Sequence, residues 1–238
     1  WREEKIPDEW LQGIIVKLPK KGDMKNTKNW REVTLLVVAL KIFARGSFER
    51  IQDPIEAILR KQQAGFRRGK STSDQIFVMR RQIEEAQEHQ RSLVVNFVGF
   101  VKAFDSVYRE ALWGILREYG VPEKLIRMIK IMYDGFKCTV LHEGKFTSFF
   151  AVESGVKQGC LLSGILFIMI IDWLMKRTTE GRDTGVQWVG NEVLEDVNYA
   201  DDLALKSDRV EDAQGKATRL IRKAKLVGLK VNAKKMEI

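Results

Sequence analysis

Residues 193–207 read Val-Leu-Glu-Asp-Val-Asn-Tyr-Ala-Asp-Asp-Leu-Ala-Leu-Lys-Ser. The apolar residues on both sides of the acidic pair predict two strands joined by a tight turn that carries Asp201 and Asp202. Adjacent carboxylates repel each other unless a cation neutralises them. Two Mg²⁺ ions would do so and would assemble a site for phosphoryl transfer. The alternative is an ordinary polar turn, because Asp is common in turns.

Further motifs precede this turn along the chain. Residues 155–163 read Gly-Val-Lys-Gln-Gly-Cys-Leu-Leu-Ser, in which glycines flank an amide side chain. Glycines let the backbone approach a flat ligand closely, while the amide supplies directed hydrogen bonds. Further upstream lie the segments 97–106 (FVGFVKAFDS), 64–72 (AGFRRGKST), 29–31 (NWR) and 18–23 (LPKKGD).

The composition is that of a folded protein with a polyanionic partner. The 238 residues are 45% hydrophobic and 31% charged with a net charge of +9, which argues against disorder and favours nucleic acid or an acidic membrane surface. Basic residues gather in segments 17–31, 60–70 and 213–235. Together these clusters favour a nucleic-acid surface, although each alone could be a solvated face.

The cysteine content and the length of the apolar runs indicate the cellular compartment in which the protein resides. Cys138 and Cys160 cannot form a disulfide framework, and no metal-binding Cys/His spacing is present. The apolar run from Ile165 to Ile171 is far shorter than a bilayer requires. No signal peptide opens the chain, and Trp1 suggests a piece of a longer protein. We expect an intracellular protein, nuclear or cytoplasmic, that is not secreted and has no membrane partner.

Local patterns predict an α+β fold with an antiparallel sheet. Helices are expected at 72–90, 112–119, 125–132, about 163–177 with Ser163 as its cap, and 217–227 closed by Gly228. Residues 32–44 begin strand-like and then become helix-like. Strands are expected at 13–18, 92–101, 138–141, 146–152, 186–189, 193–199 and 203–205, with a turn at Gly190–Asn191.

The order and spacing of these motifs resemble the reverse transcriptase domain of non-LTR retrotransposons of the long-interspersed-element type, over essentially the whole chain. The resemblance implies a right-hand polymerase with fingers (1–92), a palm (93–238) carrying the Tyr-Ala-Asp-Asp hairpin, and no thumb. Residues of about 108–150 would form a helical insertion and hairpin. It further implies RNA-directed DNA polymerase activity with an RNA template, a DNA primer, deoxynucleoside triphosphates and two Mg²⁺ ions, or Mn²⁺.

The resemblance also assigns roles to individual residues. Asp201 and Asp202 match metal-binding carboxylates, and Lys235 matches a lysine near the leaving pyrophosphate. Residues that match nucleotide-binding positions are Phe104 beneath the sugar, Gln158 and Gly159 at the incoming nucleotide, and Arg31 with Lys20 or Lys17 at the triphosphate. Phe104 could instead be a core residue, and Arg31 or Lys235 a surface charge.

This chain departs from the family pattern where a third carboxylate is expected. The pattern Phe-x-Asp-Phe-x-Lys-Ala-Phe-Asp runs here from Phe97 to Asp105 with Gly99 in place of the first Asp. We expect Asp105 to lie too far away to replace it and to cap the following helix. The backbone of Gly99 or the carbonyl of Phe100 could approach a metal, but neither brings a charge. Without this metal ligand, the rate of nucleotide transfer should be lower by orders of magnitude.

Other family positions are also altered. Glu32 and Gly164 stand where the family usually has Pro, and Met236 stands where it has Thr. These changes indicate a decaying genomic copy. Two alternatives remain open: a non-catalytic RNA- or RNA–DNA-binding module, and an unstable product without a role. The sequence leaves the oligomeric state open.

Overall fold

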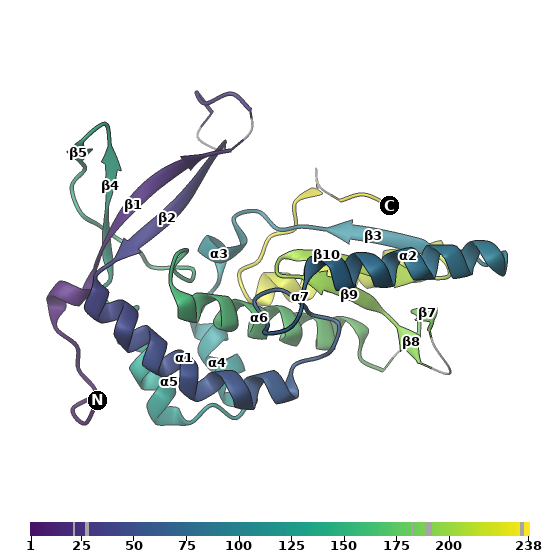
Figure 1. Cartoon of the computed structure of the whole chain (residues 1–238), viewed down its shortest axis with the longest axis horizontal. Coiled ribbons are helices and arrows are strands. Elements are labelled where there is room, and N and C mark those ends of the chain that lie inside the picture. The colour runs from purple at the N-terminus through teal and green to yellow at the C-terminus, as the bar shows by residue number, and fades with distance from the viewer. Residues whose placement is uncertain (21, 27–28, 182, 189–191, 234–235) are drawn as a thin grey trace.

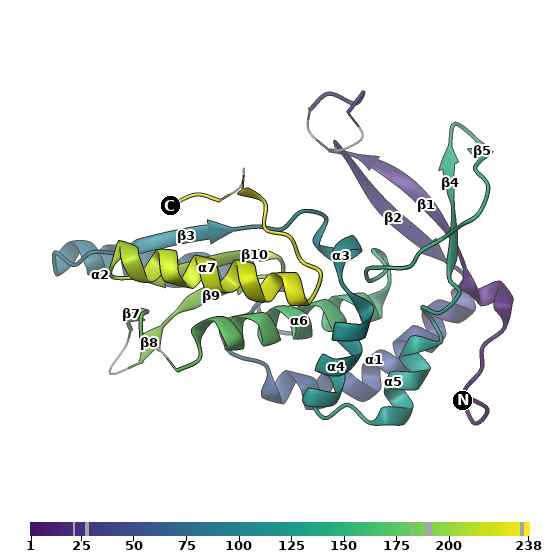
Figure 2. The same cartoon turned by 180° about the vertical axis from the view of Figure 1, so that it is seen from behind.

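The two larger β-sheets lie toward opposite ends of the long axis of the molecule, and helices run alongside the smaller of the two and lie between and below both (Figures 1 and 2). The computed structural model describes residues 1–238 except 21, 27–28, 182, 189–191 and 234–235. The predicted turn at Gly190–Asn191 therefore lies outside the described residues.

The larger sheet has the order β2-β1-β4-β5, and β6 also pairs with β4. Its elements are β1 (Gln12–Pro19), β2 (Trp30–Leu36), β4 (Lys137–His142), β5 (Lys145–Phe146) and β6 (Phe150–Ala151). The strand predicted at 13–18 and the hairpin predicted around residues 142–144 are confirmed. The β1–β4 pair is parallel, a pairing that the sequence analysis did not predict.

The smaller sheet is antiparallel, with the order β3-β10-β9. It consists of β3 (Val94–Val98), β9 (Asp196–Tyr199) and β10 (Asp202–Ser207), so the turn at Asp201 joins the last two strands. The strand predicted at 92–101 ends at Val98 and is less buried than expected, since Phe97 is 48% exposed. A separate two-stranded ribbon is formed by β7 (Val186–Gln187) and β8 (Val193–Leu194).

A buried helix, α6 (Leu161–Thr179), holds the two sheets on one core. It packs against α1 (Val38–Ile58), α4 (Arg109–Glu118) and α7 (Val210–Leu226). The remaining helices are η1 (Asp8–Leu11), α2 (Thr72–Glu88), α3 (Ala103–Ser106) and α5 (Glu123–Lys130). The run from Ile165 to Ile171 is completely buried in α6. Among the described residues, no helix is long and apolar enough to cross a membrane.

Two predicted helix caps are wrong. Ser163 lies inside α6, which begins after Cys160, and its hydroxyl contacts the Tyr133 hydroxyl instead. Asp105 lies inside the short helix α3, and Tyr108 occupies the position before α4 without a capping side chain. Both errors have the same form: the cap was assigned to a polar residue near an expected helix start, and the helix begins at a different residue.

Candidate active site

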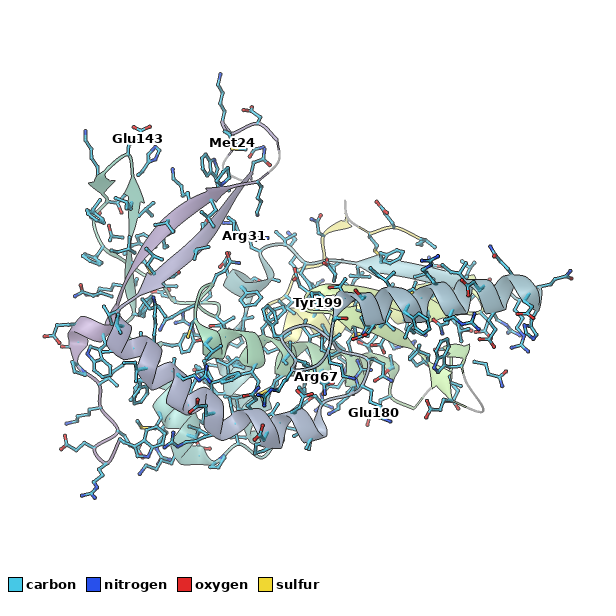
Figure 3. All side chains as sticks on the ribbon, viewed as in Figure 1. Met24, Arg31, Arg67, Glu143, Glu180 and Tyr199 are labelled. Atoms are coloured by element: carbon cyan, nitrogen blue, oxygen red, sulfur yellow. The ribbon has the colours of Figure 1, made fainter. Side chains whose placement is uncertain are left out.

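The acidic turn is a two-residue loop in which Tyr199 pairs with Asp202. Ala200, the first loop residue, has φ +55° and is therefore left-handed, a conformation that ordinarily favours glycine. The aromatic ring of Tyr199 is partly exposed beside the turn, near the middle of the molecule (Figure 3). The loop thus presents Asp201 and Asp202 at the end of the three-stranded sheet.

The register of the smaller sheet places position 99 next to this turn. Val98 pairs with Leu203, so the following residue, Gly99, stands opposite Asp202. On the other edge of β3, the Asn232 amide donates to the Gly99 carbonyl at 2.9 Å, and Phe100 bridges to Val231. Gly99 therefore follows directly after β3, between the C-terminal segment and the acidic hairpin.

The residues present do not fit a complete two-ion centre. Asp201 and Asp202 supply adjacent carboxylates, but Gly99 supplies none. Within the described part of the chain, no group of three or more His, Cys, Asp or Glu side chains could hold a metal ion. Phe100 is buried in the core, and its backbone carbonyl is neutral. Mg²⁺ prefers charged oxygen ligands, so the site lacks a ligand that a pair of divalent ions would require.

Asp105 belongs to a separate charged group between β2 and α3. Burial and the nearby Glu32 carboxylate raise the pKa of Asp105, while Lys102 and Lys20 oppose that shift. Lys102 also pairs with Glu32 at 3.2 Å across the gap between the two elements. The sequence did not indicate this group, because Glu32 was recognised only as a replacement for Pro. Its partners come from distant segments that local patterns do not connect.

The Gln158–Gly159 motif is attached to β2. The Thr34 amide donates to the Gln158 carbonyl at 2.7 Å, and a Cβ on Gly159 would lie 2.7 Å from the Thr34 carbonyl oxygen. Gly159 also has φ +111°, which disfavours any residue with a side chain. Gln158 lines a cavity of about 150 Å³ together with Glu32, Thr34 and Asp105. The motif thus lies where the larger sheet meets α6.

Lys157, next to Gln158, is a buried cation that the sequence did not single out. Its ammonium lies 4.3 Å from the ring centre of Tyr133 and 3.8 Å from that of Phe136, and it donates to the Met132 carbonyl. Burial lowers the pKa of Lys157 to about 7. Arg109 donates to the carbonyls of Gly155 and Ser154 at 3.0 Å each. These cations fasten the glycine-rich loop to α4 and the start of β4.

Phe104 has features of a core residue and of a residue that contacts the nucleotide sugar. Its ring stacks on Phe167 at 4.5 Å and meets Phe66 edge-on at 5.8 Å, so it packs against the core. It is only partly buried, which leaves part of the ring accessible. Gly164 lies against Phe66: a Cβ there would be 3.1 Å from the ring. Glycine in place of the family's usual Pro at position 164 therefore leaves space for the Phe66 ring in this aromatic cluster.

The basic candidates lie on the β1–β2 hairpin. Arg31 is exposed on β2 and, in the view of Figure 3, lies on the side turned toward Tyr199. Lys20 is exposed beyond the end of β1, where its amide donates to the Asn29 carbonyl at 2.8 Å. Lys17 lies over the Trp30 ring at 5.2 Å. Lys235 lies outside the described residues.

Comparisons with known proteins agree on one family. The family model described as "Reverse transcriptase (RNA-dependent DNA polymerase)" matches residues 18–238. The Xenopus laevis transposon TX1 uncharacterized 149 kDa protein is 30% identical over 72% of this chain and 13% of its own length. The Drosophila melanogaster Pol polyprotein of the type-2 retrotransposable element R2DM is 27% identical over 97% of this chain and 21% of its own length. The chain thus spans about a fifth or less of these relatives.

Solved structures show the same fold. Apo telomerase from Candida tropicalis, truncated from its C-terminal domain, superposes with a TM-score of 0.69 at 16% identity, covering 98% of this chain and 51% of that one. Telomerase from Candida albicans in complex with a TWJ fragment of telomeric RNA gives 0.63 at 13% identity, covering 98% and 43%. At this identity the likeness concerns the fold, which is that of a polymerase with mixed α and β structure.

Proposed function

The chain belongs to the reverse transcriptase (RNA-dependent DNA polymerase) family, in its non-LTR retrotransposon branch, and from this premise we propose that it binds an RNA template with a DNA primer but copies the template poorly. The family resemblance predicted from the sequence is confirmed by these relatives.

The observation that carries the proposal is the position of Gly99 opposite Asp202. Divalent ions held by the carboxylates of Asp201 and Asp202 would supply positive charge for the primer 3′-oxygen and for the triphosphate. A glycine at this place removes one anionic ligand. A loss of about 3 kcal/mol of transition-state stabilisation would lower the rate by about a hundredfold.

We assign the three-stranded sheet with α6 and α7 to the palm and the β1–β2 hairpin to the fingers. The sequence placed the border near residues 92 and 93. The packing of α2 on β9, and the pairing of β4 with β1, support a modified division. In it, α2 accompanies the palm sheet and the 137–151 hairpin accompanies the fingers.

The nucleotide would bind between these parts. Gln158 and Gly159 are fastened to β2, Phe104 is partly exposed on α3, and Arg31 and Lys20 are exposed on the hairpin. This distribution supports binding of the base and sugar near α3 and of the triphosphate near the basic hairpin. Mg²⁺ or Mn²⁺ would be held by Asp201 and Asp202.

Primer extension on an RNA template tests the proposal. The chain and its Gly99→Asp variant would be compared with Mg²⁺ and with Mn²⁺, with Gly114→Asp as a control. Gly114 is exposed on α4, where an added Cβ meets no atom within 4 Å, so this control adds the same charge away from the turn. We expect weak extension by the chain, an increase of about a hundredfold for Gly99→Asp, and no change for the control. Robust synthesis by the unaltered chain would contradict the impairment.

A second candidate function is a non-catalytic RNA- or RNA–DNA-binding module. It is favoured by the incomplete carboxylate set together with the exposed basic residues of the β1–β2 hairpin. This module would bind RNA with steep salt dependence and little sequence preference. It predicts that Gly99→Asp leaves extension undetectable while RNA binding is retained.

A further inference from the structure

The left-handed Ala200 is held by one buried side chain, Gln63. The Gln63 Oε1 accepts the Ala200 amide at 3.0 Å and the Gly65 amide at 2.8 Å, and Nε2 donates to the Ala200 carbonyl at 3.2 Å. Gln63 is completely buried. Both backbone polar groups of the strained residue are therefore bound by the same amide.

The backbone on both sides of Gln63 is paired with β9. The Asn198 amide donates to the Gln62 carbonyl at 2.9 Å, and the Ala64 amide donates to the Asn198 carbonyl at 3.0 Å. A Cβ on Gly65 would lie 2.7 Å from the Cα of Ala200. Only glycine lets this segment approach the turn so closely.

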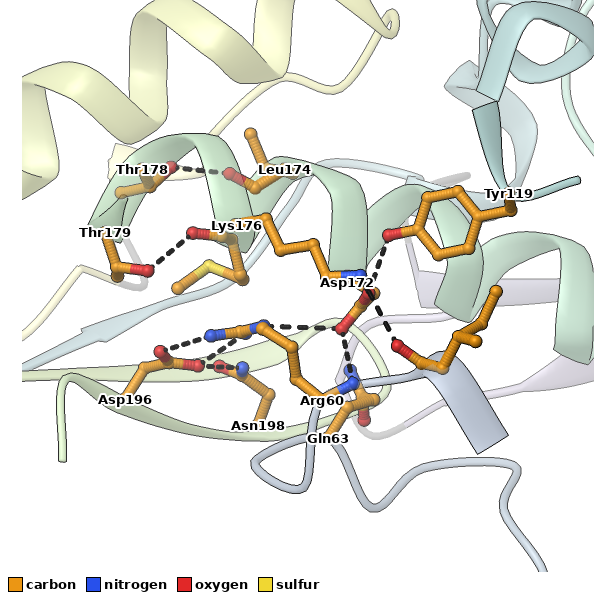
Figure 4. Close-up of polar contacts among 12 residues, drawn as sticks. Arg60, Gln63, Tyr119, Asp172, Leu174, Lys176, Thr178, Thr179, Asp196 and Asn198 are labelled. Carbon is orange, nitrogen blue, oxygen red and sulfur yellow. Dashed lines mark hydrogen bonds and ion pairs between the residues drawn. The ribbon is translucent and has the colours of Figure 1, made fainter. Parts of the chain in front are cut away.

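Arg60 anchors the same segment to the core (Figure 4). Its guanidinium binds both oxygens of Asp196 on β9 at 2.9 Å and contacts Asp172 on α6 at 3.3 Å. The Arg60 amide also donates to Asp172 at 3.0 Å. Both carboxylates are completely buried, so they fix Arg60 in one orientation and bring Gln63 to the turn.

We propose that residues 60–65, here called the Gln63 clasp, are a positioning element for the acidic turn, with Gln63 as its positioning residue. A left-handed alanine persists only where its surroundings hold it there. The clasp supplies that constraint, and the next residues in the chain are Asp201 and Asp202. The direction in which the carboxylates point is thereby set by a segment more than a hundred residues upstream. The consequence for catalysis rests on the proposed function, but the constraint on the turn does not.

Hydrogen exchange, measured residue by residue by NMR on the whole chain, tests the constraint. Gln63→Met removes the polar atoms at nearly the same volume, and Gln62→Met is the matched control, because Gln62 contributes only its backbone carbonyl to the pairing with Asn198. We expect exchange of the Ala200 and Gly65 amides to become at least tenfold faster in Gln63→Met, with little change in Gln62→Met. Amides of α4, such as that of Leu112, serve as the reference for the rest of the fold.

Gln63→Glu is the second variant, in case Gln63→Met fails to fold. A protonated carboxyl can accept from the Ala200 amide and donate to its carbonyl, as the glutamine does. Protection of Ala200, corrected for intrinsic exchange, should therefore approach the original value as the pH falls. The proposal is overturned if Ala200 stays protected in Gln63→Met, if α4 amides lose protection to the same degree, or if Gln63→Glu shows no recovery at low pH.

The effect of the clasp on catalysis is tested separately, by steady-state kinetics. In the Gly99→Asp background, Gln63→Met should lower kcat by about tenfold while the KM for the nucleotide changes little, because the turn and not the nucleotide pocket is disturbed. A rise in KM at constant kcat would refute this consequence. If Gly99→Asp itself shows no extension, the proposed function fails, whereas the exchange measurements still decide the clasp.

Discussion

Gly99 stands opposite Asp202 in the register of β3 on β10, one residue beyond the pair formed by Val98 and Leu203. Opposite residues of antiparallel strands present their side chains on the same face, about 5 Å apart at Cβ. A carboxylate at position 99 would therefore lie beside the Asp202 side chain. The Gly99 carbonyl is bonded to the Asn232 amide and the preceding Val98 pairs with Leu203, so the change from the family pattern removes a ligand and leaves the neighbouring backbone pairing in place.

Gly99→Asp should raise the affinity for Mn²⁺ by about tenfold or more. A third carboxylate adds a charged oxygen where Asp201 and Asp202 already supply two. Calorimetric titration or the spin-resonance signal of free Mn²⁺ measures the affinity. Gly114→Asp, with the same charge on α4, should leave it unchanged. Equal gains in both variants would show that net charge, and not position 99, is responsible.

Gly65→Ala should destabilise the chain by about 3 kcal/mol, because the added methyl meets the Ala200 backbone and cannot be accommodated by a flexible side chain. Urea unfolding measures this loss. Gly114→Ala is the matched control: it lies in an open position of α4 and should stabilise by about 0.5 to 1 kcal/mol. If Gly65→Ala proved as stable as the unaltered chain, the close approach of the clasp to the turn would be refuted.

Local patterns predicted much of the fold and the centre of the site. The acidic turn, the strand at 13–18, the hairpin at 142–144 and the helix before Gly228 follow from apolar periodicity and turn residues, which act within a few positions. The proximity of Gly99 to the turn followed from the family resemblance. These are features that neighbouring residues or a known motif determine.

Features that depend on distant segments could not be predicted from the sequence. The parallel pairing of β1 with β4 joins residues more than a hundred positions apart and leaves no local signal. Gln63 resembles any polar residue of a loop until β9 lies against it, and Asp105 resembles a cap until Glu32 is beside it. Tertiary contacts decide the role of such polar residues, because their hydrogen-bonding groups bind whichever partner the fold supplies.

Arg60→Met should cost about 3 to 5 kcal/mol, since it leaves the buried Asp196 carboxylate without its guanidinium partner, whereas Asp172 keeps its ion pair with Lys176 at 2.9 Å. Urea unfolding again gives the value. Arg45→Met is the control, because the Arg45–Glu49 pair is exposed on α1 and should contribute at most about 1 kcal/mol. Similar small losses in both variants would mean that the buried network does not anchor the clasp.

Lys206→Met should reduce the pH dependence of stability. Lys206 is completely buried on β10, where it contacts Gln82, and burial lowers its pKa to about 7 against a raising influence of Asp196. An unfolded lysine titrates near pH 10.4, so between about pH 7 and 10 the unfolded chain binds more protons and stability rises with pH.

The rise that Lys206 contributes between about pH 7 and pH 9 amounts to about 2 kcal/mol, and Lys206→Met should remove it. Lys157, whose pKa is also lowered to about 7, retains its own contribution in the variant. Urea unfolding at the two pH values provides the comparison, with the exposed Lys225→Met as control. An unchanged slope in Lys206→Met would show that burial does not lower the pKa of this lysine.

RNA binding should depend on the β1–β2 hairpin more than on the total charge. Lys20 and Lys25 are exposed at its tip, whereas Lys41 and Lys124 are exposed on α1 and α5, away from the tip (Figure 1). Each phosphate of a single strand that a lysine neutralises adds about 0.7 to the steepness of log K against log salt. The double change Lys20→Met/Lys25→Met should therefore reduce this steepness by about 1.4, measured by fluorescence anisotropy with a labelled single-stranded RNA. Lys41→Met/Lys124→Met removes the same charge and should leave the slope nearly unchanged. Equal reductions in the two double variants would show that the RNA responds to net charge and that the hairpin is not its binding surface.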